Sequence, residues 1–307
     1  MQFKTVLLFS LLTAFAIGQE RTTIKQDITI NRYIDGTLLI PSETDNPPLA
    51  IIIAGSGPTD RDGNQNFMQN NSLKKLAEAL SRNGIATFRY DKRIVKQIRQ
   101  RNVDDDMMFD DFVTDAVSTL NYFKQKYNFK AIHFIGHSQG SLVGMLAATE
   151  GADGFISLAG AGKPIDQVII DQIEKTAPMF TEDSKRVFDI LREGKTTDDF
   201  PPALASIFNK DVQPFITNWM QYDPQNEIKS LSIPILLING TKDLQVVPEE
   251  AKLLKSANDR AELVIIENKN HILVPIEGDD LENSKSYNES QRKLSKELID
   301  KIVAFMN

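Results

Sequence analysis

Residues 132–140 of this chain read Ile-His-Phe-Ile-Gly-His-Ser-Gln-Gly, an apolar run that leads directly into the pattern Gly-x-Ser-x-Gly. A helical pattern follows at Ser141–Glu150. A strand-to-helix turn tight enough to lift Ser138 clear of a sheet has no room for side chains two residues to either side, and Gly136 and Gly140 supply that room. The stretch therefore predicts a strand, a sharp turn carrying a serine, and a helix. The alternative is a chance match or a purely structural turn.

Apolar runs alternate with helical patterns along the rest of the chain. Strands are expected at residues 49–54, 85–90, 131–135, 154–158, 233–238 and 263–267, and helices at 70–81, 104–126 and 290–306. An antiparallel hairpin, with strands at 23–33 and 36–40 around Asp35-Gly36, precedes them. Strands that alternate with helices predict an α/β fold with a mostly parallel central sheet and helices on both faces.

One segment breaks this alternation. Residues 162–230 contain several helical stretches punctuated by prolines and no convincing strand. We expect a helical insertion between two strands of a core that comprises residues 19–161 and 231–307. The insertion is interpreted as a lid over a site, and plain packing against one face of the sheet is the alternative.

The N-terminus has the pattern of a secretory signal peptide. Lys4 precedes a largely apolar run at residues 6–17, and Ala16-Ile17-Gly18 provides small residues at the cleavage positions. Because the run is too short to span a bilayer comfortably, we expect cleavage after residue 18 and no stable membrane insertion. The protein is then exported, to a bacterial periplasm or the medium. A retained anchor helix is the alternative.

Composition excludes several classes of protein. The 307 residues include no cysteine, which rules out disulfides, iron–sulfur clusters and thiol nucleophiles, and only three histidines, which leave little for a metal site. We therefore expect no metal. The formal net charge of −7 argues against a nucleic-acid partner, because no basic stripe is available to neutralise phosphates.

A serine hydroxyl is a poor nucleophile until a base takes its proton, so an imidazole must reach Ser138. His137 is its immediate neighbour, and its ring cannot swing onto the adjacent hydroxyl. His133 lies five residues upstream, within the strand. Both are interpreted as structural. His271, in a polar loop after the last predicted strand, remains as the candidate base, with a surface histidine as the alternative.

The base needs an acid that fixes its tautomer, and the strand at residues 235–238 runs into a turn that carries Asp243. This carboxylate would accept a hydrogen bond from His271 and stabilise the imidazolium. Glu249 and Glu250 lie past a proline in the next helix and are weaker candidates. Asp243 as a mere turn residue is the alternative.

An oxyanion that forms during acyl transfer needs two preorganised N–H donors. One is expected to be the backbone N–H of Gln139, directly after the nucleophile. The other is expected in the glycine-rich loop at residues 55–64, with the Ser56 N–H favoured and the Gly57 N–H as second choice. Such a loop can also cradle phosphate, but the lysine and glycine patterns of nucleotide-binding loops are absent from the sequence.

Together these motifs resemble those of an α/β-hydrolase, and more narrowly of bacterial carboxylesterases of the serine-aminopeptidase-like (hydrolase-4, EstD-type) group. The resemblance rests on GSGPTDRDGN at 55–64, RYDKR at 89–93, GHSQG at 136–140, GTKD at 240–243 and His271. It covers nearly the whole chain, and the order Ser138, Asp243, His271 is that of the fold family. One departure follows Arg93, where the group usually has a glycine-containing loop and residues 94–101 here are basic and glycine-free.

The resemblance implies a serine esterase that cleaves short-chain acyl esters of small molecules without a cofactor. Within the enzyme class, aminopeptidase-like amide cleavage, thioester hydrolysis and lipid hydrolysis stay open. A peptidase would need lid acids for a free amino terminus, and the candidates are Glu174, Glu182 and Asp183. From a different class, a non-catalytic protein that binds carbohydrate or peptide on a hydrolase scaffold also stays open. The charged residues Arg89, Asp91 and Arg93 are expected to form a salt-bridge network.

Overall fold

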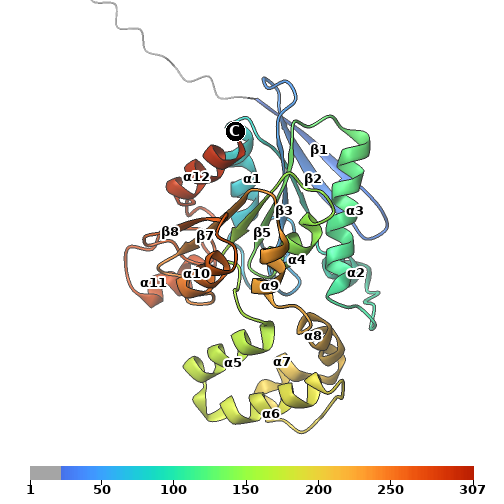
Figure 1. The fold of residues 1–307 in the computed structure, drawn as a ribbon, viewed down its shortest axis with the longest axis vertical. Helices are drawn as coiled ribbons and strands as arrows, with labels where there is room; N and C mark the ends of the chain where they lie inside the picture. Colours follow the sequence, from blue (N-terminus) through green and yellow to red (C-terminus); the bar gives the residue numbers. More distant parts are fainter. Residues whose placement is uncertain (1–21) are drawn as a thin grey trace, which may run out of the picture.

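A single twisted sheet of eight strands organises the protein in the computed structural model, which describes residues 22–307 (Figure 1). The strands lie in the order β1-β2-β4-β3-β5-β6-β7-β8. Their bounds are Thr23–Thr29 (β1), Asp35–Pro41 (β2), Leu49–Ile53 (β3), Ala86–Tyr90 (β4), Ile132–His137 (β5), Gly154–Leu158 (β6), Ile235–Gly240 (β7) and Glu262–Ile266 (β8). β1 and β2 form an antiparallel hairpin, β2 pairs antiparallel with β4, and the remaining pairs are parallel. The predicted, mostly parallel sheet with an N-terminal hairpin is confirmed.

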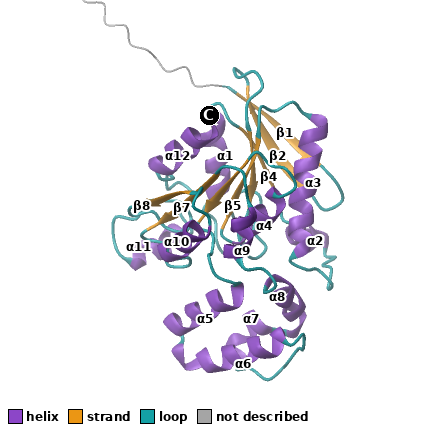
Figure 2. Ribbon diagram, in the orientation of Figure 1, coloured by secondary structure: helices purple, strands orange, loops and turns teal. Residues whose placement is uncertain are grey.

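Helices cover both faces of this sheet (Figure 2). α1 (Ser72–Arg82) and α12 (Lys296–Met306) bury leucines and isoleucines against one face. α3 (Asp110–Lys126), α4 (Gln139–Ala148) and α10 (Pro248–Ala257) pack their apolar stripes on the other. The fully buried central strands need apolar cover on both sides, which explains their continuous runs of Ile, Leu and Phe. Within residues 22–307, no helix combines the length and apolarity required to span a bilayer. The predicted signal peptide, residues 1–18, lies outside the described residues.

The chain between β6 and β7 is helical. It contains α5 (Ile165–Thr176), α6 (Thr181–Arg192), α7 (Ala205–Phe208), α8 (Gln213–Trp219) and α9 (Pro224–Ser230). α5 to α8 gather at one end of the molecule around an apolar core of their own that includes Phe188 and Phe208 (Figure 1). α9 packs instead on α4 and α10. The extent of a lid at 162–230 stays a prediction.

The hairpin turn lies earlier than predicted. β1 ends at Thr29, and Asp35 and Gly36, expected at the turn, begin β2. The turn forms at residues 30–34 because the Asn31 side chain accepts hydrogen bonds from the Tyr33 and Ile34 N–H groups, at 2.8 and 3.1 Å. Gly36 is needed in the strand for another reason, since a Cβ there would collide with the Phe88 ring.

The segment after Arg93, where the resembled group usually has a glycine-containing loop, is the helix α2 (Arg93–Gln100). Its sequence contains no glycine or proline, and ion pairs from Lys96 to Asp35 and from Arg99 to Asp91, both 2.8 Å, fix it to the sheet. Two predicted helices begin later than expected, α3 at Asp110 and α12 at Lys296. The Ser295 hydroxyl caps α12 by accepting from the Leu298 N–H. Ahead of α3, the Asp111 carboxylate in the first turn accepts from the Met108 N–H.

The turn from β5 into α4 is strained and tightly packed. Ser138 has φ 54° and ψ −121°, a conformation that non-glycine residues rarely adopt. A Cβ on Gly136 would overlap the Gly140 carbonyl group, and one on Gly140 would overlap the carbonyl oxygens at the end of β3. The two glycines therefore allow the turn to close against the sheet.

We predict that Gly136→Ala destabilises the fold by about 2 to 3 kcal/mol, because the added methyl group meets backbone that has no room to move. Gly144→Ala on α4 is the matched control, since its methyl group would meet only side-chain atoms at 3.2 Å or more. Alanine also favours the helix there. Urea unfolding monitored by circular dichroism measures both, and equal stability of the two variants would contradict the prediction.

Candidate active site

His271 and Asp243 form a buried pair beyond the ends of β8 and β7. His271 Nδ1–H donates to Asp243 Oδ2 at 2.8 Å, and the other carboxylate oxygen accepts from the N–H groups of Gln245 and Val246, at 2.9 Å each. Burial alone would raise the pKa of Asp243, but attraction to His271 and these hydrogen bonds outweigh it and hold the pKa below its usual value. The carboxylate therefore stays charged and leaves Nε2 of the imidazole free to accept a proton.

The loop that carries His271 is fixed by its neighbour Asn270, which is fully buried. The Asn270 side-chain amide donates to Asn283 Oδ1 at 2.8 Å and to the Ser286 hydroxyl at 3.0 Å, both on α11 (Asp280–Ser286). Its carbonyl oxygen accepts from the Val274 N–H. The polar sequence of this loop thus builds a rigid support for the imidazole rather than a solvated turn.

His137 holds the same loop from the opposite side. Its Nε2–H donates to the His271 carbonyl oxygen at 2.8 Å, and the centres of the two rings lie 4.8 Å apart. Burial, and then the neighbouring His271, lower the pKa of His137 to about 3, so this ring is neutral at ordinary pH. His133 lies in β5 with its ring against Phe305. Both contacts are structural, as the sequence suggested.

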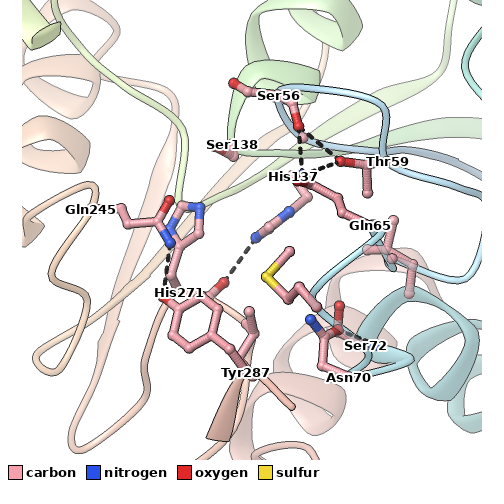
Figure 3. A pocket seen from close by; sticks show the side chains of 15 residues that line it. Ser56, Thr59, Gln65, Asn70, Ser72, His137, Ser138, Gln245, His271 and Tyr287 are labelled. Atoms are coloured by element: carbon pink, nitrogen blue, oxygen red, sulfur yellow. Dashed lines mark hydrogen bonds between the residues drawn. The ribbon is translucent and has the colours of Figure 1, made fainter. Parts of the chain in front are cut away.

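Ser138 and His271 line the same cavity, of about 130 Å³, together with His137 and Gln245 (Figure 3). Within the described part of the chain, no hydrogen bond joins the Ser138 hydroxyl to the His271 ring. Such contacts are often loose before substrate binds. A second and larger cavity, of about 300 Å³, also borders Ser138 and is lined mainly by apolar side chains, including Leu142, Val168 and Trp219.

The two expected N–H donors belong to segments that meet beside Ser138. Gln139 is the first residue of α4, where backbone N–H groups have no acceptor within the helix. The Ser56 N–H donates no hydrogen bond within residues 22–307, and both residues line the second cavity. Gly55 lies against the serine, since a Cβ on it would be 3.2 Å from the Ser138 Cβ.

Lys92 joins these two segments, a role that sequence reasoning missed. Its ammonium group donates to the Gly55 carbonyl oxygen at 3.0 Å and to Gln139 Oε1 at 2.6 Å, and it stands 4.2 Å from the centre of the Phe112 ring. No carboxylate pairs with it in the described structure, and burial lowers its pKa to about 7. The only signal in the sequence is a lysine within the RYDKR motif, whose partners cannot be known before the fold.

Ion pairs fasten the loop at residues 55–64 to the end of β4. The pairs are Arg61–Asp91 (2.8 Å), Arg89–Asp62 (3.0 Å) and, on α2 and α3, Arg93–Asp115 (2.8 Å). Arg89, Asp91 and Arg93 therefore all form ion pairs, as expected: Arg89 and Asp91 with Asp62 and Arg61 of the loop, and Arg93 separately with α3.

The other acidic residues that the sequence offered as candidates make different contacts. Glu250 accepts from the N–H groups of Gly162 and Lys163 at 2.7 and 3.0 Å and so fixes the start of the inserted helices. Glu182 and Asp183 pair with Lys185 and Arg186 on α6, and Glu174 is exposed on α5; none of these three acids lines either cavity. Among residues 22–307, no cluster of His, Asp and Glu side chains has the arrangement of a metal site.

The neutral ring of His137 gives a testable pH dependence of stability. Because the folded-state pKa is lowered from 6.5 to about 3, only the unfolded chain takes up this proton between those values. The stabilisation is complete above pH 6.5 and is lost as pH falls, by about 1.4 kcal/mol per pH unit. In urea unfolding between pH 7.5 and 4.5, His137→Gln should lose stability less steeply than the unchanged chain; identical slopes would contradict this assignment.

Comparison with known proteins places the chain in a family. Esterase EstD from Thermotoga maritima is 26% identical over 264 residues, which cover 83% of this chain. The chain spans 61% of the length of that relative. Among solved structures, Est1E from Butyrivibrio proteoclasticus superposes with a TM-score of 0.57 at 18% identity, over 91% of this chain and 97% of that one.

An esterase from Pyrococcus furiosus has a TM-score of 0.55 at 15% identity, over 97% of this chain and 94% of that one. At these identities the structures show the same fold. The model of the alpha/beta hydrolase family matches residues 72–282, well over half of the chain, and includes the serine turn and the His271–Asp243 pair. By its sheet order, its serine turn and this match, the protein belongs to the alpha/beta hydrolase family.

Proposed function

We propose that this protein is an exported carboxylesterase that hydrolyses short-chain acyl esters through Ser138, His271 and Asp243. One observation carries the proposal: a serine on a strained turn lines the same cavity as an imidazole whose Nδ1–H is bound by a buried carboxylate. The name of the Thermotoga maritima relative, Esterase EstD, supports ester hydrolysis. The N-terminal sequence pattern supports export to a periplasm or the medium.

The proposed reaction has two halves. His271 Nε2 takes the proton of the Ser138 hydroxyl as its oxygen attacks the ester carbonyl carbon, and Asp243 stabilises the imidazolium. The oxyanion accepts hydrogen bonds from the backbone N–H groups of Gln139 and Ser56. The bond to the alcohol oxygen breaks as His271 returns the proton to it. Water, activated by the same imidazole, then attacks the acyl-enzyme and releases the acid.

The larger cavity supports a short acyl group. Its volume of about 300 Å³ is at the lower end of ligand pockets, and Val168, Ile169 and Trp219 of the inserted helices line it. The same helices supply no acidic side chain to the cavities beside Ser138, which favours an ester over a peptide with a free amino terminus.

Ser138→Ala should lower kcat/KM for p-nitrophenyl acetate by at least about 10³-fold, because the attacking oxygen is removed. Ser141→Ala is the matched control, a buried serine on the same helix whose hydroxyl bonds Ser157 at 2.7 Å. A fluorophosphonate probe should label the control and not Ser138→Ala. If Ser138→Ala hydrolysed the ester as fast as the unchanged chain, Ser138 would not be the nucleophile.

Lys92→Met should lower kcat about tenfold or more with little change in KM, because the segments of both proposed oxyanion donors lose their common anchor. The methionine side chain has a shape similar to that of the aliphatic part of the lysine. Lys75→Met is the control, since the Lys75 ammonium also binds a backbone carbonyl, that of Arg292, and neither residue lines the two cavities beside Ser138. A rise in KM at constant kcat would assign Lys92 to substrate binding and refute its positioning role.

A further inference from the structure

Two cavities of different character meet at Ser138. Ten of the fifteen residues that line the smaller one, of about 130 Å³, have polar side chains, and we call it the polar cavity. The larger one, of about 300 Å³, we call the apolar cavity. Of these two cavities, His271 lines only the polar one and Gln139, whose N–H faces the oxyanion in the proposed reaction, lines only the apolar one. Ser56, Ser138 and Gln245 line both.

This division assigns the two halves of an ester. The imidazole must hand its proton to the oxygen of the departing alcohol, so the alcohol leaves on the side that His271 lines. The acyl group extends to the side of the oxyanion donor, into the apolar cavity. The chemistry of the polar cavity therefore describes the alcohol.

Asn70 lines the polar cavity, and its side-chain amide has an unused donor. It is 1% exposed, and its Oδ1 accepts from the Ser72 N–H at 2.9 Å, but its Nδ2 has no partner within the described structure. A buried donor without an acceptor costs free energy, which a bound oxygen would remove. In Figure 3, Asn70 and Tyr287 lie at the end of the cavity away from Ser138.

Tyr287 supplies a second donor. Its hydroxyl oxygen accepts from Gln245 Nε2 at 2.8 Å, and within residues 22–307 its own proton goes to no acceptor. Burial raises the pKa of Tyr287 to about 12, so the hydroxyl keeps this proton. Gln65 adds an acceptor, because its Nε2 is held by the Ser56 carbonyl oxygen and the Thr59 hydroxyl and its Oε1 is left over.

The cavity carries no formal charge. No Asp, Glu, Lys or Arg side chain lines it, and His137 is neutral. A carboxylate or an amine would therefore find no counter-ion there. Its volume is enough for several groups the size of water, which matches a three-carbon polyol.

We propose that the polar cavity binds a small neutral polyol as the alcohol half of the substrate, with the Asn70 amide and the Tyr287 hydroxyl donating to its free hydroxyl oxygens. This inference rests on the proposed esterase function. The substrate class is then an ester of a short acyl group with a polyhydroxylated alcohol, of which glyceryl monobutyrate is the simplest probe.

The test compares glyceryl monobutyrate with butyl butyrate, which has the same acyl group and an alkyl alcohol, by pH-stat titration on the full chain. We expect kcat/KM to favour the glyceryl ester by about tenfold or more, since one hydrogen bond contributes about fivefold. Asn70→Asp keeps the acceptor for the Ser72 N–H and loses the donor, so the ratio should fall about fivefold. Tyr287→Phe should lower it similarly without adding charge.

Asn83→Asp, at the other end of α1, is the matched control and should keep the ratio of the unchanged chain. Equal rates on the two esters would overturn the polyol subsite and leave the esterase proposal standing. A glyceryl preference that survives in folded Asn70→Asp and Tyr287→Phe, as judged by thermal unfolding, would also overturn it. If the protein hydrolyses none of the three esters (glyceryl monobutyrate, butyl butyrate and p-nitrophenyl acetate), the esterase proposal itself is wrong.

Discussion

The close approach of the β5–α4 turn to the end of β3 is the constraint on which the site depends. Gly140 lies so near the carbonyl groups of Ile53 and Ala54 that no side chain fits between them. This contact brings the glycine-rich loop after β3 beside Gln139 and forces Ser138 into its strained conformation. The strain persists because packing on both sides determines the backbone completely. The proposed nucleophile and the proposed oxyanion donors are therefore set by one backbone contact.

Buried polar groups fix the two loops of the site, the His271 loop and the loop after β3, which the backbone contact does not hold by itself. The His271 loop is held by Asn270 on one side and by His137 on the other, and the loop after β3 is held by Lys92. Each of these groups is kept away from water and has a specific backbone partner. Such contacts are costly to leave unmade, which makes them effective at specifying one geometry.

The sequence predicted the sheet, the alternation of strands and helices along the chain, and the candidates Ser138, Asp243 and His271. These features depend on the spacing of apolar residues and on the order of motifs, which are local signals. The sequence misplaced the hairpin turn, since the Asn31 side chain, and not Gly36, closes it. Lys92 and Asn70 escaped notice because their meaning depends on loops that meet only in three dimensions. The lid boundaries, export and the catalytic roles stay predictions.

The inserted helices leave the sheet after β6 and return at β7, and these two strands are neighbours. The two ends of the insertion are thus close together and anchored independently of what lies between them. A segment attached in this way can be lengthened, shortened or exchanged at little cost in chain entropy and without disturbing the sheet. Because it lines the apolar cavity but carries neither Ser138 nor His271, the lining of this cavity can diverge during evolution while the proposed catalytic residues stay the same.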